Sequence, residues 1–336
     1  MKIVLVSDTW EPDVNGVATT LKNLYDHLIA MGHDVFLIHT GMFENFQCPG
    51  YSDIRIAKHA NYLRFVLKNL KFDSIHIVTE GPLGWAARRY CLDNAIAFTS
   101  AYHTKFPEYL KSKFGIPLWL SYRVLQKFHE HSSKILVTSQ GMREELLDRG
   151  FKCVELVGLG VDTNTYNPKW RSSVPGRNEP VFINVGRVSK EKNLTEFYEA
   201  DLPGRIVQVG DGPELDAYRA KYPHVEFVGA KSGVELATYY ANADVFVFPS
   251  RTDTLGLVML EAMASGIPIA AHDTVGSAQI VLNGVTGIIS EDLKQACIAA
   301  LKLNSGDCVE QAKKFDWGTT TRGFLKHQVY KYETND

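Results

Sequence analysis

The stretch FPSRTDTLGLVMLEAMASGIPIAA, residues 248–271, joins an apolar segment to a helical one through a single short loop. Val245 to Phe248 is an apolar run closed by Pro249, which is typical of a parallel strand buried on both faces. Gly256 then opens a segment whose apolar residues recur at helical spacing. A loop between a strand and a helix amino terminus leaves backbone N–H groups free to bind an anion. We therefore expect a phosphate site here.

Two acids frame the loop and the helix. Asp253 lies at the end of the loop, and Glu261 lies inside the helix among apolar and small residues. In one interpretation Asp253 caps the helix and Glu261 is a solvated surface residue. In the other, which we favour, both acids bind a ligand, because a carboxylate in apolar surroundings needs a partner. Thr254, Leu255 and Gly256 would supply the backbone donors of the site.

Two acids separated by seven residues, the second within LEAMASGIP, resemble the E-x7-E signature of retaining glycosyltransferases of family 4, which have the GT-B fold. The resemblance implies that Glu261 binds the nucleotide ribose and that Asp253 lies near the donor sugar, with the amides between them on the diphosphate. Asp253 stands where the family has Glu. PSRTDTLGLV is similar to a glycolipid-forming subgroup, the diacylglycerol glycosyltransferases and the sulfoquinovosyl- and GDP-mannose-dependent transferases.

Composition excludes several classes of protein. A chain of 336 residues favours two domains, and a net charge of −2 gives no nucleic-acid footprint. No run of eighteen apolar residues could span a bilayer, and the opening MKIVLVSDTW is better read as a strand than as a signal peptide. The five scattered cysteines fit free thiols in a reducing cytoplasm. Spaced dinucleotide-binding glycines, a phosphate loop and a D-x-D motif are absent, so we expect neither a cofactor nor a metal.

Short β-rich runs alternate with helical segments along the whole chain, which predicts an α/β fold with parallel sheets. Residues 167–180 are rich in Pro, Ser, Gly and charge, as linkers are. We therefore expect domains at 1–167 and 168–315, followed by a helical tail at 316–336. The resemblance implies a GT-B arrangement of two Rossmann-like domains facing a central cleft, with the tail crossing back to the first domain.

Three further segments predict contacts to the donor. Asn15 and Gly16 follow the first strand and favour left-handed conformations that let a backbone approach a ligand. Arg187 and Lys192 would form a cationic clamp beside the phosphate site. The resemblance implies that Gly16, Arg187 and Lys192 hold the diphosphate, and that His103 lies next to the donor sugar. It assigns further donor contacts to Gly186, Gly210 and Asp211.

Two stretches of the first half are basic. Arg64, Lys68 and Lys71 are expected to share one face of a helix, and residues 101–129 mix cations with aromatics, including Lys105, Phe106 and Trp119. Such a mixture suits an anionic membrane surface or a lipid acceptor. A solvated helix face is the alternative for either stretch taken alone.

The sequence therefore predicts a metal-independent retaining hexosyltransferase that uses a nucleotide-sugar, with a UDP-sugar favoured, and a lipid such as diacylglycerol. The expected setting is the cytoplasmic face of a membrane, with peripheral association. The alternatives are a GDP-mannose-dependent mannosyltransferase acting on a glycolipid or polysaccharide, a catalytically silent nucleotide-sugar-binding protein, and a sugar-nucleotide epimerase.

Overall fold

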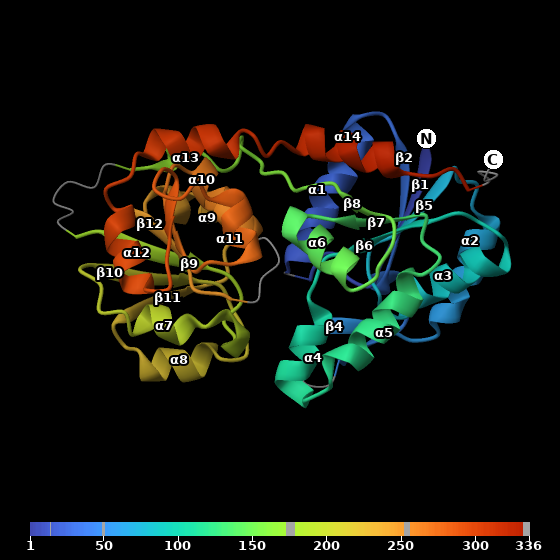
Figure 1. Cartoon of the computed structure of the whole chain (residues 1–336), viewed down its shortest axis with the longest axis horizontal. Helices are drawn as coiled ribbons and strands as arrows, with labels where there is room; N and C mark the ends of the chain where they lie inside the picture. Colours follow the sequence, from blue (N-terminus) through green and yellow to red (C-terminus); the bar gives the residue numbers. More distant parts are fainter. Residues whose placement is uncertain (14, 49–50, 173–178, 252–255, 332–336) are drawn as a thin grey trace. The chain divides into compact units, whose positions relative to one another are not determined.

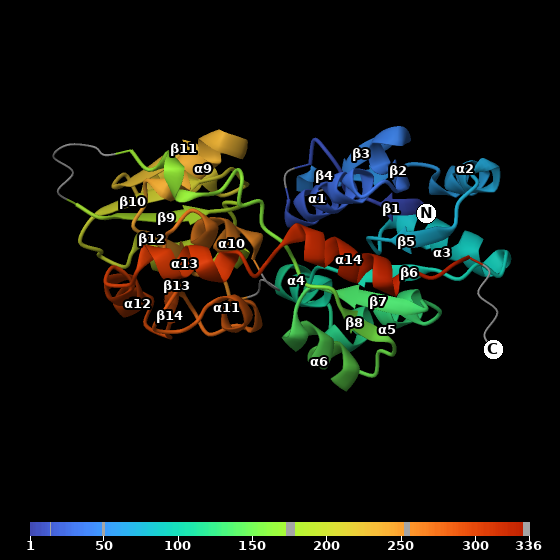
Figure 2. The same ribbon diagram turned by 90° about the horizontal axis from the view of Figure 1, so that it is seen from above.

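The chain folds into two compact units, which Figures 1 and 2 show in a computed structural model that describes residues 1–13, 15–48, 51–172, 179–251 and 256–331. Unit 1 comprises residues 1–158 and 317–336, and unit 2 comprises residues 159–316. The division falls after Gly158, upstream of the 167–180 stretch that composition favours. The reason is packing: Arg171 Nη2 lies 2.8 Å from Asp244 Oδ1, which ties the beginning of that stretch to unit 2.

Unit 1 is built on a parallel sheet of six strands in the order β2-β1-β5-β6-β7-β8. An antiparallel hairpin of β3 and β4 is inserted after β2. The strands are β1 (Lys2–Ser7), β2 (Asp34–His39), β3 (Asn45–Cys48), β4 (Tyr51–Ala57), β5 (Ser74–Ile77), β6 (Thr99–Tyr102), β7 (Lys134–Val137) and β8 (Val154–Leu156). The helices are α1 (Gly16–Ala30), α2 (Leu63–Asn69), α3 (Pro82–Asp93), α4 (Phe106–Phe114), α5 (Leu118–His129), α6 (Gln140–Asp148) and α14 (Trp317–His327), with short 3-10 turns η1 (Thr40–Met42) and η2 (Ala60–Tyr62).

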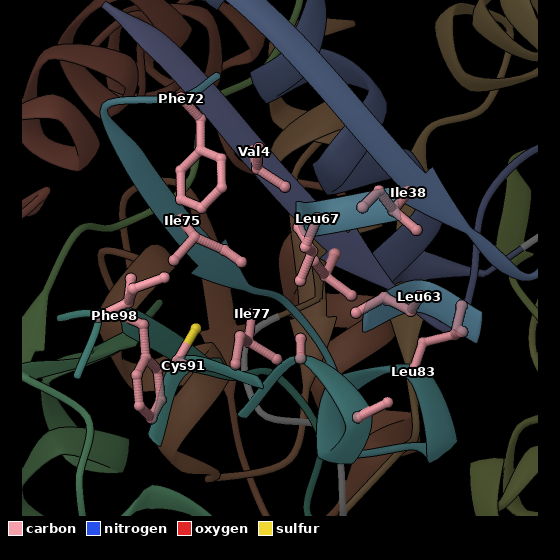
Figure 3. Packing of buried hydrophobic residues seen from close by; sticks show 14 of the residues in the cluster. Val4, Ile38, Leu63, Leu67, Phe72, Ile75, Ile77, Leu83, Cys91 and Phe98 are labelled. Atoms are coloured by element: carbon pink, nitrogen blue, oxygen red, sulfur yellow. The ribbon is translucent and has the colours of Figure 1, made fainter. Parts of the chain in front are cut away.

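Alternate residues of β1 supply two separate cores, because successive side chains of a strand point to opposite faces of the sheet. Val4 and Val6 pack with Leu63 and Leu67 of α2 and with α3, in the cluster of buried side chains drawn in Figure 3. Ile3 and Leu5 face the other way, toward α1 and α14. Helices on both faces explain why residues 3–6 of this strand are all apolar.

The C-terminal helix α14 belongs to unit 1, and Figures 1 and 2 both show it, in red, among the elements of that unit. Its Phe324 is 2 % exposed and packs with the residues that α1 and β1 contribute to the core. The ring of Phe324 also lies edge-on to His76 of β5, with centroids 5.0 Å apart. The tail is therefore held by apolar burial within unit 1.

Unit 2 repeats the plan with six parallel strands in the order β11-β10-β9-β12-β13-β14. The strands are β9 (Val181–Val185), β10 (Arg205–Val209), β11 (Val225–Gly229), β12 (Val245–Phe248), β13 (Ile269–Ala271) and β14 (Gly287–Ile289). The helices are α7 (Leu194–Tyr198), α8 (Leu215–Lys221), α9 (Gly233–Ala241), α10 (Leu257–Ala264), α11 (Val275–Ile280), α12 (Leu293–Ala300) and α13 (Ser305–Ala312), with 3-10 turns η3 (Pro168–Trp170) and η4 (Lys190–Lys192).

The two Rossmann-like sheets confirm the predicted α/β class, and β12 and α10 lie where the 245–264 pattern places them. The observed strand β6 begins at Thr99, because the Ile96 N–H donates to the carbonyl of Cys91 and closes the turn after α3.

Candidate functional site

Three loops of unit 2 leave the carboxyl ends of adjacent strands. β9, β10 and β12 are neighbours in the sheet, and the loops that follow them begin at Gly186, Gly210 and Pro249. Since the strands are parallel, these loops gather at one edge, where α/β proteins bind their ligands. The fold therefore brings together the predicted donor residues Gly186, Arg187, Lys192, Gly210, Asp211 and Gly256 at one edge of a single sheet.

The loops after β9 and β10 fit tightly against each other. The Val188 N–H donates to the carbonyl of Asp211 at 2.9 Å, and the Gly186 N–H donates to that of Val209 at 3.0 Å. Gly210 has a φ of +135°, and a Cβ placed there would lie 1.9 Å from the carbonyl oxygen of Gly186. Gly210 thus allows the two loops to approach, and it contributes to the site through backbone geometry.

Replacing Gly210 with alanine should displace the loop that carries Arg187. The methyl group cannot fit beside the Gly186 carbonyl, so we expect a loss of roughly 2 kcal/mol of stability or more from overpacking and backbone strain. Thermal unfolding measures the loss. The matched control is Gly229→Ala, which also has a positive φ but no atom within 4 Å of the added carbon. Equal melting temperatures for the two variants would contradict the argument from loop contact.

The turn that carries Lys192 is held from two sides. Lys192 ends η4, and Asn193 follows in the left-handed region at a φ of 54°. The Asn193 amide donates to Glu196 Oε2 at 2.5 Å and to the Pro249 carbonyl at 3.3 Å. It therefore links the turn to the start of the loop after β12. Both Arg187 and Lys192 are half-buried.

The loop of the predicted phosphate site is described only in part. Asp253, Thr254 and Leu255 lie outside the described residues. Gly256 precedes α10 at a φ of 84° and a ψ of 82°, a left-handed conformation that glycine adopts at little cost.

Glu261 is buried in unit 2, as the second interpretation requires. Glu261 is 9 % exposed, and its Oε2 accepts a hydrogen bond from the Tyr240 hydroxyl at 2.9 Å. Burial raises the pKa of Glu261 to about 7, although hydrogen bonds from Tyr240 and Tyr166 oppose the shift. The predicted solvated carboxylate of the first interpretation is therefore wrong, and the required partner is a tyrosine.

The first loop of unit 1 differs from its prediction. Asn15 is extended, at a φ of −153°, and its side chain caps α1 by accepting from the Ala18 N–H. Gly16 is the first residue of α1 and does not have the positive φ expected of it. It is exposed, however, with no atom within 4 Å of a Cβ placed there. The cap explains the extended backbone and leaves open space beside Gly16.

His103 lies directly after β6, at the carboxyl edge of the unit 1 sheet. It lines a small cavity of about 40 Å³ together with His76, Thr20 and Thr138, at the edge of the α1 and α14 core. Burial lowers the pKa of His103, and the carboxylate of Glu80 partly opposes that shift. A neutral imidazole next to an acid is a group that can donate or accept a hydrogen bond at neutral pH.

Several residues that were predicted to contact a membrane have different contacts or positions in the structure. Arg64 lies 2.8 Å from Asp93, and Lys105 lies 2.7 Å from Glu145, so both cations are in ion pairs within unit 1. Lys71 falls outside α2, which ends at Asn69, so the predicted helix face shared with Lys68 is wrong. Lys68, Phe106 and Trp119 are exposed as expected.

The sequence analysis missed two buried networks of polar side chains. His76 Nδ1 lies 2.8 Å from Thr99 Oγ1, which donates to Gln328 of the tail segment at 3.2 Å. His129 lies between Glu80 and Ser100. Polar residues inside otherwise apolar strands were the available signal, but it does not say which side chains meet. Among the described residues, no group of three His, Cys, Asp or Glu side chains is arranged to hold a metal ion.

Two family models match the chain, one on each unit. The model described as "Glycosyltransferase Family 4" matches residues 14–165, and the one described as "Glycosyl transferases group 1" matches residues 179–304. The two matches together include every predicted donor residue, from Gly16 to Glu261.

Curated relatives match over most of their length. A protein named sulfoquinovosyl transferase, from Arabidopsis thaliana, is 30 % identical, covering 94 % of this chain and 70 % of the relative. A GDP-mannose-dependent alpha-mannosyltransferase from Corynebacterium glutamicum is 28 % identical over 89 % and 79 % of the two chains. An alpha-monoglucosyldiacylglycerol synthase from Streptococcus pneumoniae is 27 % identical over 90 % and 78 %.

The fold has a close counterpart among solved structures. Sucrose-phosphate synthase from Thermosynechococcus elongatus superposes with a TM-score of 0.80, over 97 % of each chain, at 21 % identity. At 21 % identity the similarity is evidence for the fold alone. With the family models, the relatives and the two Rossmann-like sheets in agreement, the chain belongs to glycosyltransferase family 4, with the GT-B fold.

Proposed function

We propose that this glycosyltransferase moves a hexose or hexuronic acid from a UDP-sugar to a lipid such as diacylglycerol, forming a glycolipid with retention and without a metal. The enzyme would act at the cytoplasmic face of a membrane, bound to anionic lipid. The observation that carries the lipid assignment is the outer face of α5 in unit 1.

The outer face of α5 is apolar and cationic at once. Trp119 is 66 % exposed, Leu120 43 % and Val124 50 %, and their side chains share the face with exposed Arg123 and Lys127. We call these five residues the α5 face. The opposite side of the helix, which includes Tyr122, Leu125 and Phe128, is buried. No acid occurs in α5, so nothing on the helix itself opposes an anionic surface.

Neighbouring α4 extends this surface. Its exposed aromatics, Phe106 at 48 % and Phe114 at 58 %, flank the exposed cation Lys111. Exposed aromatics among cations are typical of helices that lie in a membrane interface. No helix in the described part of the chain is long and apolar enough to cross a bilayer.

The relatives support the same acceptor class. One is named a monoglucosyldiacylglycerol synthase, and the relative with the highest identity quoted above is named a sulfoquinovosyl transferase. The transfer itself would rest on unit 2. As the sugar–phosphate bond breaks, negative charge grows on the diphosphate, and the cations of Arg187 and Lys192 with the amides after Asp253 would stabilise it. The leaving phosphate would take the proton of the acceptor.

The test is nucleotide release from UDP-glucose, UDP-galactose, UDP-glucuronate and GDP-mannose, each with and without liposomes of diacylglycerol and anionic lipid. We expect release from one UDP-sugar only when liposomes are present, and no change when EDTA is added. Release with soluble acceptors alone would overturn the lipid assignment. Conversion of the donor without release would indicate an epimerase, and binding without turnover would indicate a silent binding protein.

A second candidate is supported by the Corynebacterium relative, whose name specifies GDP-mannose. The same assay separates the two, because release from GDP-mannose and not from the UDP-sugars would replace the favoured donor. Anomeric analysis of the glycolipid product tests retention.

An acid placed on the α5 face should weaken membrane binding. Val124→Asp removes an apolar contact and adds a charge that an anionic surface repels, so we expect about tenfold less protein bound to anionic vesicles in a sedimentation assay. The matched control is Val234→Asp on α9 of unit 2, because Val234 is also 50 % exposed. Equal binding of both variants would rule out the α5 face as the docking surface.

A further inference from the structure

Three titratable side chains follow neighbouring strands at the carboxyl edge of the unit 1 sheet. Asp8 follows β1, Glu80 lies between β5 and α3, and His103 follows β6. Asp8 is fully engaged: its carboxylate accepts from the N–H groups of Leu83 and Gly84 at 2.8 and 3.3 Å and from the Thr79 hydroxyl at 2.8 Å. It caps α3, and burial raises its pKa. Asp8 therefore has little capacity left for a ligand.

Glu80 is anchored on one side only. Its Oε1 is buried 3.4 Å from His129 Nε2, while the side chain as a whole stays 21 % exposed. His129 is 1 % exposed at its side chain, and its Nδ1 lies 2.8 Å from the Ser100 hydroxyl, which lies 2.7 Å from that of Ser132. The carboxylate thus lies against His129, which the buried hydroxyls of Ser100 and Ser132 hold from behind.

We call Ser132, Ser100 and His129 the relay. Their hydrogen bonds have one consistent direction from donor to acceptor. If Ser132 donates to Ser100, and Ser100 donates to His129 Nδ1, then Nε2 carries the imidazole proton, and it lies 3.4 Å from Glu80 Oε1 in a contact that is not a hydrogen bond. The arrangement orients Glu80 and leaves it acceptor capacity, since an ionised carboxylate has about four lone-pair positions.

Within unit 1, Glu80 interacts with His103 and contacts the end of α5. Burial lowers the pKa of His103, and the charge of Glu80 partly opposes that shift. The anchor of Glu80, His129, is the last residue of α5, the helix whose outer face we assign to lipid. An acceptor held by that helix would bring its polar head to this edge of unit 1.

We propose that Glu80 binds the acceptor hydroxyl, accepting its hydrogen bond and orienting its oxygen for transfer, and that His129, Ser100 and Ser132 position Glu80. This inference deepens the proposed function and rests on it. The acceptor would be a glycerol-type alcohol presented at a lipid surface. Glu80 takes no proton in this role, because the leaving phosphate receives it. The geometry points to a site made before the acceptor arrives, which reduces the reorganisation that binding requires.

Glu80→Gln tests the assignment at nearly constant shape. We expect kcat/KM for the liposome acceptor to fall at least tenfold, because a neutral amide is a weaker acceptor than a carboxylate. The dissociation constant for the donor, measured by calorimetry, should stay within twofold. Ser132→Ala should show the same pattern to a smaller degree, because it acts through the relay. The control is Glu144→Gln on α6, an exposed glutamate of the same unit.

The outcomes separate this inference from the function on which it rests. If the unaltered enzyme turns over no donor with liposomes, the proposed function fails and the role of Glu80 fails with it. If the enzyme is active and Glu80→Gln matches the Glu144→Gln control, only the role of Glu80 is overturned. Equal losses in donor affinity and turnover would also overturn it, since Glu80 would then serve the donor or the fold. If Glu80→Gln does not fold, Ser132→Ala decides alone by the same comparison of acceptor kcat/KM with donor affinity.

Discussion

Lys192→Ala should lower turnover about 100-fold or more while leaving the fold intact. Lys192 ends the η4 turn, which Asn193 ties to the loop after β12, so its ammonium group is carried by a fixed support. Removing one preorganised donor from a developing negative charge typically costs a factor of 10² to 10³ in kcat. Steady-state nucleotide release, with the donor that the liposome assay identifies, measures the effect. Arg187→Ala is expected to lose as much.

The matched control for Lys192 is on the same turn. Lys190 begins η4, and its side chain is 80 % exposed and 3.8 Å from Glu214. Lys190→Ala removes the same charge two residues away, so it should keep turnover within a few-fold. If Lys190→Ala loses as much as Lys192→Ala, the effect comes from net charge. If Lys192→Ala keeps turnover within a few-fold, the edge of unit 2 is not the diphosphate site.

Arg187 and Lys192 should also differ in what can replace them. A guanidinium presents a planar fork of donors to a phosphate, whereas an ammonium is a compact point charge. Arg187→Lys should therefore restore only part of the activity lost in Arg187→Ala. Full recovery would mean that Arg187 contributes charge alone. Arg187 is the second residue after β9, in the loop that packs against Gly210.

The sequence predicted the parts of the fold that depend on local pattern. The apolar run at β12 and the helical spacing after Gly256 predicted a strand followed by a helix, and the structure confirms both. Periodicity works there because both faces of the strand and most of the helix are buried, so nearly every position carries the same signal. Asn15 shows the limit: its residue type suits a left-handed turn and a helix cap equally, and the cap was formed.

Contacts between distant segments could not be predicted. Glu261 called for a partner, yet nothing near it in the sequence named Tyr240, which lies on α9. Lys105 was predicted to contact a membrane, but in the structure its Nζ lies 2.7 Å from Oε2 of Glu145 on α6. In both cases packing decides which group meets which, and charge or burial alone only states that a partner is required.

Glu261→Gln should stabilise the protein at neutral and alkaline pH. Burial raises the pKa of Glu261 from 4.5 to about 7, so the folded state holds a proton that the unfolded state releases. Between about pH 4.5 and 7 the unfolded state binds fewer protons, and stability therefore falls as pH rises. The shift corresponds to about 3 kcal/mol once both states are ionised, above pH 7. Glutamine has no proton to lose, so its melting profile should lack this decline.

The same substitution, Glu261→Gln, distinguishes an acid that binds the nucleotide ribose from an acid that serves only the fold. A carboxylate that binds ribose accepts hydrogen bonds from sugar hydroxyls, so Glu261→Gln should weaken nucleotide binding about tenfold above pH 7, where the acid is ionised, and less below it. Glu235→Gln, on the same helix as Tyr240 and with a side chain 61 % exposed, is the control for both measurements. A stabilised variant with unchanged nucleotide affinity would assign Glu261 to the fold alone. A variant that gains stability and loses affinity would show that the site keeps a destabilising carboxylate because the donor requires it.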